Sequence, residues 1–147
     1  MAGPLAPGAV EVKIIGMEEL RADLRDVSKR VATNAIRSAI RQAGKLVIDS
    51  AKARVPVRRG KLRKGITQRV STKRGVVRTK VGFLRKAYYG MFVELGHAVV
   101  SHGKVVGSVS ARPFLRPALA ENEGLISDVF AGFVRGQIAK RRAKGQG

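Results

Sequence analysis

The spacing of hydrophobic and polar positions changes several times along the chain, and each change predicts a new element. Apolar and polar side chains alternate over residues 10–14, which predicts a short, half-buried strand that ends at Gly16. Apolar residues then recur at helical spacing over residues 17–27, with acidic residues near the start of that helix. Residues 1–8 are mainly small residues and prolines, and we expect them to form a flexible arm.

The longest helical pattern covers residues 28–54, which contain no proline. Its apolar stripe repeats every three or four residues and consists of Ala32, Ile36, Ala39, Ile40, Ala43, Val47 and Ala51. The opposite face carries arginine and lysine, so the helix is strongly amphipathic. The small side chains of the stripe let a sheet or another helix approach closely. Val55 and Pro56 end the helix, because a residue that precedes proline is disfavoured in the helical region.

A run of β-branched residues follows in the middle of the chain. Residues 65–72 and 75–83 predict two antiparallel strands. The Lys-Arg-Gly segment at residues 73–75 suits the turn of a hairpin between them. The outward positions of both strands are mostly basic.

The last third of the chain is harder to assign. Residues 87–95 fit either a short helix or a buried strand, and their helical spacing of apolar side chains favours a helix that ends at Gly96. Residues 97–111 predict a long loop or an extended hairpin. The final helix is expected to begin near Pro113 or Pro117 and to continue to about residue 141, since proline suits the first helical turn.

These elements predict one α+β domain, in which a long amphipathic helix and a C-terminal helix pack on a small antiparallel sheet. We place the domain at residues 9–139, between the flexible arm at residues 1–8 and a basic tail at residues 140–147. The length of 147 residues and the hydrophobic fraction of 44% suit a single globular domain.

Charge is distributed very unevenly along the chain. There are 30 basic and 10 acidic residues, which give a formal net charge of +20. Residues 50–93 hold fourteen lysines and arginines and no acid. One interpretation is a solvated surface that maintains solubility, and the other is a surface that meets a polyanion, either DNA or an acidic protein. The size and the one-sidedness of the excess favour the second interpretation.

Composition argues against several classes of function. The chain has no cysteine, which excludes disulfides, cysteine-ligated zinc and thiol catalysis. No apolar run is long enough for a bilayer span, and the first residues predict no signal peptide, so we expect neither secretion nor membrane insertion. Nucleases gather carboxylates around a metal ion, whereas acids are scarce in this chain.

The candidate constellation for a catalytic or metal site is Glu94, His97 and His102. Their spacing matches no helical metal motif, and no rigid third ligand is evident. We therefore expect a structural glutamate and two loop histidines, with no metal, no cofactor and no enzymatic activity. Base stacking is also disfavoured, because we expect the core to bury most of the aromatic residues Phe83, Tyr88, Tyr89, Phe92, Phe114, Phe130 and Phe133.

Three short motifs occur in order along the chain. They are A-x-x-x-V-P-V-R-x-G-x-L-R-x-x-I at residues 51–66, Y-Y-G-M-F-V-E-L-G-H at residues 88–97 and A-R-P-F-L-R-P-A-L at residues 111–119. Together they resemble the tail-component family of long-tailed bacteriophages, the small neck proteins also called tail-completion or head-to-tail joining proteins. The resemblance covers about residues 31–130.

The resemblance implies a non-enzymatic structural protein of the virion. Such a protein forms a closed ring in the neck, at the head-proximal end of the tail, with six copies as the symmetry of the tail implies. The implied partners are further copies of the chain, the head-side connector and the tail terminator or tail tube proteins, with transient contact to genomic DNA. Assembly would take place in the cytoplasm of the host bacterium.

The three motifs are expected to meet at one end of the sheet. The residues that we expect to contact neighbouring subunits or partners are Arg58, Arg59, Gly60, Leu62, Arg63, Tyr88, Phe92, Glu94, Gly96, Arg112, Phe114 and Arg116. Glu94 is the only acid in this neighbourhood of the sequence, and we expect it to pair with one of the arginines.

A second hypothesis comes from a different class of function. A non-sequence-specific DNA-binding protein would use phosphate contacts, and its affinity would fall steeply with salt. The surface for DNA or an acidic partner would hold Lys73, Arg74, Arg78, Lys80, Arg85 and Lys86.

Overall fold

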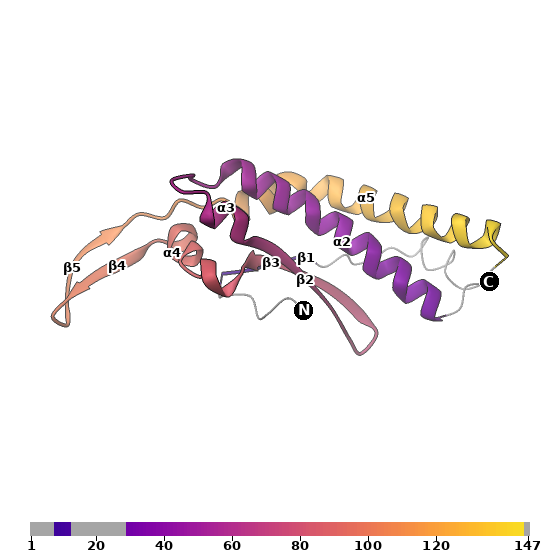
Figure 1. The fold of residues 1–147 in the computed structure, drawn as a ribbon, viewed down its shortest axis with the longest axis horizontal. Helices are drawn as coiled ribbons and strands as arrows, with labels where there is room; N and C mark the ends of the chain where they lie inside the picture. The colour runs from indigo at the N-terminus through magenta and orange to yellow at the C-terminus, as the bar shows by residue number, and fades with distance from the viewer. Residues whose placement is uncertain (1–7, 13–28, 146–147) are drawn as a thin grey trace.

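The computed structural model describes residues 8–12 and 29–145 (Figure 1). Two long helices, α2 (Lys29–Arg54) and α5 (Leu115–Ala143), run antiparallel and side by side along the molecule. α2 confirms the helix expected over residues 28–54. The helix expected over residues 17–27 and almost all of the arm lie outside the described residues. Within the described residues, no helix combines the length and the apolar character that a membrane crossing requires.

A three-stranded antiparallel sheet packs against α2. Its strands are β1 (Val10–Val12), β2 (Ile66–Lys73) and β3 (Val76–Phe83), in the order β1-β3-β2. The β2–β3 hairpin confirms the two expected strands to within one residue. Its two-residue turn has Arg74 at φ +51° and Gly75 at φ +77°, a pair of left-handed conformations that matches the right-handed twist of the strands.

The buried face of α2 is the small-residue stripe that the sequence predicts. Ala39, Ile40, Ala43, Val47 and Ala51 are buried as expected, while Ala32 and Ile36 are half-buried near the start of the helix. A second helix and a sheet both approach this stripe. The contact with the sheet is so close at Gly44 that a Cβ atom there would lie 2.3 Å from Oε1 of Gln68.

Two clusters of buried side chains form the core. One joins α2, β3 and the start of α5, where the rings of Phe83 and Phe114 meet edge to face with their centroids 5.8 Å apart. The other joins the first half of α2 to the second half of α5 through Ile40, Phe130 and Val134. α5 therefore packs along α2 over most of its length, which confirms a single α+β domain.

The connections between these elements contain short helices. α3 (Lys61–Gly65) follows the loop after α2, and a 3₁₀ turn, η1 (Arg85–Ala87), leads from β3 into α4 (Gly90–Leu95). α4 confirms a helix rather than a strand over residues 87–95, and it ends at Gly96 as expected, although it begins three residues later than the apolar pattern. α5 continues to Ala143, so it includes the first residues of the segment expected to be a basic tail.

Residues 97–111 form a hairpin, one of the two structures that the sequence allowed. Its strands are β4 (His97–Ser101) and β5 (Lys104–Val109), which pair with each other in a separate two-stranded sheet. Figure 1 shows this hairpin extending from the end of the molecule where α4 and the start of α5 lie. The turn of the β2–β3 hairpin points away from it, so the two hairpins project from the subunit in different directions (Figure 1).

Candidate protein-interaction site

Glu94 lies at the centre of the region where the second and third sequence motifs meet. Its carboxylate accepts hydrogen bonds from the backbone N–H groups of Phe114 at 2.8 Å, Leu115 at 3.0 Å and Arg116 at 3.1 Å. These groups begin α5 and have no acceptor within the helix. The residue is 2% exposed, so its negative charge acts on the positive end of the helix dipole with little screening by solvent.

The expected pairing of Glu94 with an arginine side chain is therefore wrong. The Glu94 carboxylate binds the backbone at the start of α5, and Arg116 contributes only its N–H group to that contact. Within residues 8–12 and 29–145, the carboxylates that form ion pairs are Glu11, with Arg78 and Lys80, and Glu121, with Arg54. The second and third motifs are also joined by a hydrogen bond from the backbone N–H of Arg112 to the carbonyl oxygen of Val93, at 2.8 Å.

Gly96 fixes the base of the β4–β5 hairpin. Its φ of +70° is a left-handed conformation, and a Cβ atom there would lie 2.7 Å from the carbonyl oxygen of Val109 and 2.8 Å from the backbone nitrogen of Ala111. The chain therefore turns sharply out of α4 and passes directly against the strand that returns from the hairpin. Only glycine combines this conformation with this close approach.

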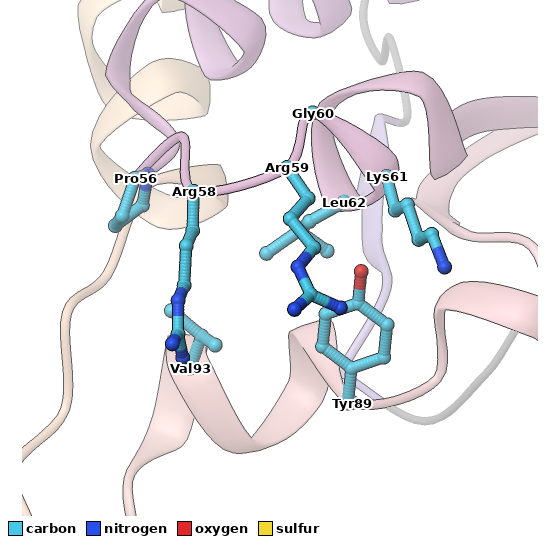
Figure 2. A pocket seen from close by; sticks show the side chains of 8 residues that line it. All are labelled: Pro56, Arg58, Arg59, Gly60, Lys61, Leu62, Tyr89 and Val93. Atoms are coloured by element: carbon cyan, nitrogen blue, oxygen red, sulfur yellow. The ribbon is translucent and has the colours of Figure 1, made fainter.

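The first motif forms one side of a pocket of about 460 Å³. Arg58, Arg59 and Gly60 come from the loop between α2 and α3, and Gly60 has a φ of +68°. Figure 2 shows the side chains of Arg58 and Arg59 extending from this loop toward α4. Leu62, which is buried, lies between the loop and α4 at the back of the pocket.

Half of the residues that line the pocket are not among the contact residues expected from the sequence. Pro56, Lys61, Tyr89 and Val93 also line it, and none of them was among the expected contact residues. A signal was present for two of them, because Tyr89 and Val93 are four residues apart and so share a face of α4. The pocket lining contains no acidic residue.

The burial of the aromatic residues differs from the expectation. Phe83, Phe114 and Phe130 are buried, as expected, whereas Tyr88, Tyr89 and Phe92 are exposed. The rings of Tyr88 and Phe92 are in edge contact with centroids 6.2 Å apart, and Phe92 contacts the ring of His97 at 5.3 Å. The apolar stripe on α4 therefore does not face the core, and it continues onto the hairpin.

The hairpin itself is apolar and fully on the surface. Every residue of β4 and β5 is exposed, including Val100 at 60% and Val105 at 70%. We define the apolar arm as Tyr88, which lies just before α4, together with exposed apolar residues of α4 and the hairpin, namely Phe92, Leu95, Val99, Val100, Val105, Val106 and Val109. Tyr88 and Phe92 were expected contact residues, whereas Leu95 and the valines were not.

The remaining expected contact residues are spread around this region. Arg63, Arg112 and Arg116 are exposed, whereas Leu62, Glu94 and Phe114 are buried and pack inside the subunit. Glu94, His97 and His102 do not converge, because the Glu94 carboxylate faces α5 and His102 is in the turn of the hairpin, next to Ser101. Among the described residues, no group of three or more potential ligands surrounds a metal position.

The basic residues proposed for DNA or an acidic partner do not form one patch. Lys73 and Arg74 lie at the turn of the β2–β3 hairpin, while Arg85 and Lys86 follow the other end of β3. An eight-residue strand, about 25 Å long, separates the two pairs. Arg78 and Lys80, between them, share the carboxylate of Glu11 at 3.7 and 3.5 Å.

Comparison with known proteins gives one family. The family described as "Bacteriophage HK97-gp10, putative tail-component" matches residues 18–96, just over half of the chain. No curated protein and no solved structure matches the chain. The match includes α2, the pocket loop, strands β2 and β3 and α4, and it stops at the base of the hairpin.

Proposed function

The chain belongs to the HK97 gp10-like family of bacteriophage tail components, and on that premise we propose that it forms a ring in the neck of the virion. The ring would complete the head-proximal end of the tail and join it to the head connector. The proposed role is structural and needs no catalytic residue. Subunits would assemble in the cytoplasm of the host bacterium and remain in the virion.

The apolar arm is the observation that carries this proposal. Contiguous apolar surface on a soluble protein marks an interaction site, and a two-stranded hairpin is at best marginally stable in water without a partner. The arm combines both features, because its valines are exposed and its strands pair with no other strand of the described chain. A neighbouring subunit would bury these side chains and pair with the free edges of β4 and β5.

The position of the arm favours a ring over a two-fold dimer. The hairpin extends from one end of the molecule (Figure 1), which would let it reach a different surface on the next subunit. Such head-to-tail contacts produce closed rings when the rotation between subunits closes, and six copies would match the symmetry of the tail. Residues 97–109 carry one lysine and no acid or arginine, which suits contact between copies that are each strongly positive.

The basic surfaces would then face the neighbours of the ring. The proposed partners are the head-side connector on one side and the tail terminator or tail tube proteins on the other. Acidic surfaces on these proteins would complement the positive charge of the subunit and would orient the docking. Genomic DNA that passes through the channel would make transient contact with the same charges.

Deletion of the gene from its parent phage tests the proposal. Negative-stain electron microscopy of the lysate should show filled heads beside unattached tails, or tails with aberrant ends. The wild-type gene supplied from a plasmid should restore joined particles. Intact, infectious particles from the deletion strain would contradict the proposal, and steeply salt-dependent DNA binding by the purified protein would then favour a DNA-coating role.

A further inference from the structure

The pocket between the α2–α3 loop and α4 combines two kinds of surface. Arg58, Arg59 and Lys61 supply positive charge, whereas Pro56 and Val93 supply accessible apolar surface. The volume of about 460 Å³ lies within the range of pockets that hold small ligands, which would also accommodate a few amino-acid side chains. A ligand that fits must therefore present negative charge and apolar groups within a short distance of each other.

No carboxylate of residues 8–12 and 29–145 forms an ion pair with the basic side chains of the pocket. Among the described residues, Arg54, Arg78 and Lys80 form ion pairs with described carboxylates, whereas Arg58, Arg59 and Lys61 do not. Two arginines at consecutive positions bring together two planar guanidinium groups, and each of these matches the geometry of a carboxylate or a phosphate. A carboxylate or a phosphate group would therefore complement the positive charge of the pocket.

Backbone hydrogen bonds hold both ends of the loop that carries Arg58 and Arg59. Gly60 accepts a hydrogen bond from the backbone N–H of Lys64 at 3.0 Å, and the backbone N–H of Val55 donates to Ala51 at 2.9 Å. Leu62 is anchored in the core. Because the backbone on both sides of the arginines is held in place, a ligand would order mainly their side chains.

The apolar part of the pocket favours a peptide over DNA. A phosphodiester backbone offers charge but no aliphatic group to cover Pro56 and Val93, so binding would leave this surface in contact with water. A peptide segment that places a leucine or valine next to an aspartate or glutamate covers both surfaces. A second copy of this chain is disfavoured as the source, because each copy carries a formal charge of +20.

We propose that this pocket binds an acidic peptide segment of another protein, with a carboxylate on Arg58 and Arg59 and a neighbouring aliphatic side chain over Pro56 and Val93. The identity of that protein as a neighbour in the neck rests on the proposed function. The apolar arm would then bind further copies of this chain, and the pocket would bind a different protein. Tyr89, at 36% exposure, borders the site and adds its ring to the contact.

Binding of model peptides to the purified full chain tests the proposal. The probe is a short fluorescein-labelled peptide that alternates glutamate with leucine, and fluorescence anisotropy follows its binding. The Arg58→Gln/Arg59→Gln variant should weaken binding at least about tenfold, as expected from the loss of two charge-assisted contacts. The matched control is Lys73→Gln/Arg74→Gln, which removes the same charge at the turn of the β2–β3 hairpin and should change affinity less than about twofold.

Two further probes distinguish the sources of negative charge. Replacing leucine by serine in the peptide should weaken binding to the wild-type protein, and a short DNA duplex should compete poorly at equal charge. If both double variants weaken the peptide equally, or if DNA competes as well as the peptide, general electrostatic attraction explains the binding and the proposal is wrong. Pocket-specific binding alongside an intact deletion phage would instead contradict the neck role and leave the pocket assignment in place.

Discussion

The carboxylate of Glu94 accepts a hydrogen bond from the backbone N–H of Leu115 at 3.0 Å, across 21 positions of sequence. This contact joins α4 to the first turn of α5, and the hairpin lies between the two in the sequence. Because α4 leads into the hairpin and α5 follows it, this contact holds both ends of the hairpin, which begins at His97. Glu94 thus positions the base of the apolar arm without itself being exposed to a partner.

Glu94→Gln should lower the stability of the subunit. The amide keeps one acceptor oxygen but removes the charge and turns a donor toward the N–H groups of α5, so we expect a loss of about 2 kcal/mol in the free energy of unfolding. Urea denaturation followed by circular dichroism measures this loss. Glu123→Gln is the control, because Glu123 is exposed on α5, and its effect should remain within about 0.5 kcal/mol. Equal effects of the two changes would contradict the capping role.

Gly90→Ala tests the packing beneath α4. A Cβ atom at this position would lie 2.5 Å from Cδ1 of Leu62 and 2.7 Å from the ring of Phe83, and both side chains are buried. We expect destabilisation of about 2 kcal/mol from overpacking. Gly124→Ala on α5 meets no atom within 4 Å and should instead stabilise the helix by up to about 1 kcal/mol. Thermal unfolding of both variants checks the opposite signs.

Gly96→Ala and Gly60→Ala separate backbone strain from steric exclusion. Both glycines have a positive φ, near +70°, but a Cβ atom at Gly60 meets nothing within 4 Å, whereas one at Gly96 overlaps Val109 and Ala111. Gly60→Ala should therefore cost about 1 kcal/mol, the usual price of the left-handed region. Gly96→Ala should cost more and should also move the hairpin, which chemical-shift changes over residues 97–109 would detect. Equal costs would show that the close approach at Gly96 is not maintained in solution.

Val100→Ser/Val105→Ser tests the apolar arm. Both valines are exposed in the isolated subunit, so the double change should leave its urea denaturation midpoint nearly unchanged. The same change removes apolar contact with the proposed neighbour, and the plaque titre of a deletion phage complemented by this variant should fall more than about tenfold. Ser108→Ala, also on the hairpin, is the control and should complement normally. A full titre with the valine variant would contradict an assembly role for the arm.

Local patterns in the sequence predict much of this fold because local physics determines the elements concerned. The spacing of alanine and valine defines the buried face of α2, and the Lys-Arg-Gly segment defines the turn between β2 and β3. The start of α5 near two prolines and the end of α4 at Gly96 also follow from the conformational limits of single residues. Each of these predictions needs only residues that are close in sequence.

The errors arise where distant segments decide the outcome. An acid among many arginines suggests an ion pair, but the backbone of α5 competes for Glu94 and lies too far along the chain for any pattern to reveal it. Helical spacing of Tyr88 and Phe92 indicates that they share a face, but it does not indicate what covers that face. The sequence shows that residues 97–109 are rich in valine, but it does not show that these valines are exposed. They are exposed because no third strand of the described chain lies beside β4 and β5.

The unpaired edges of β4 and β5 have a consequence for the free subunit before it reaches the virion. Exposed, uncharged strand edges promote uncontrolled association, and this chain presents them on a molecule with a formal charge of +20. Mutual repulsion slows the encounter of two free copies at low ionic strength, and added salt screens it. In the proposed ring, the positive charge would therefore delay self-association until an acidic neighbour neutralises part of it and lets the next copy bind.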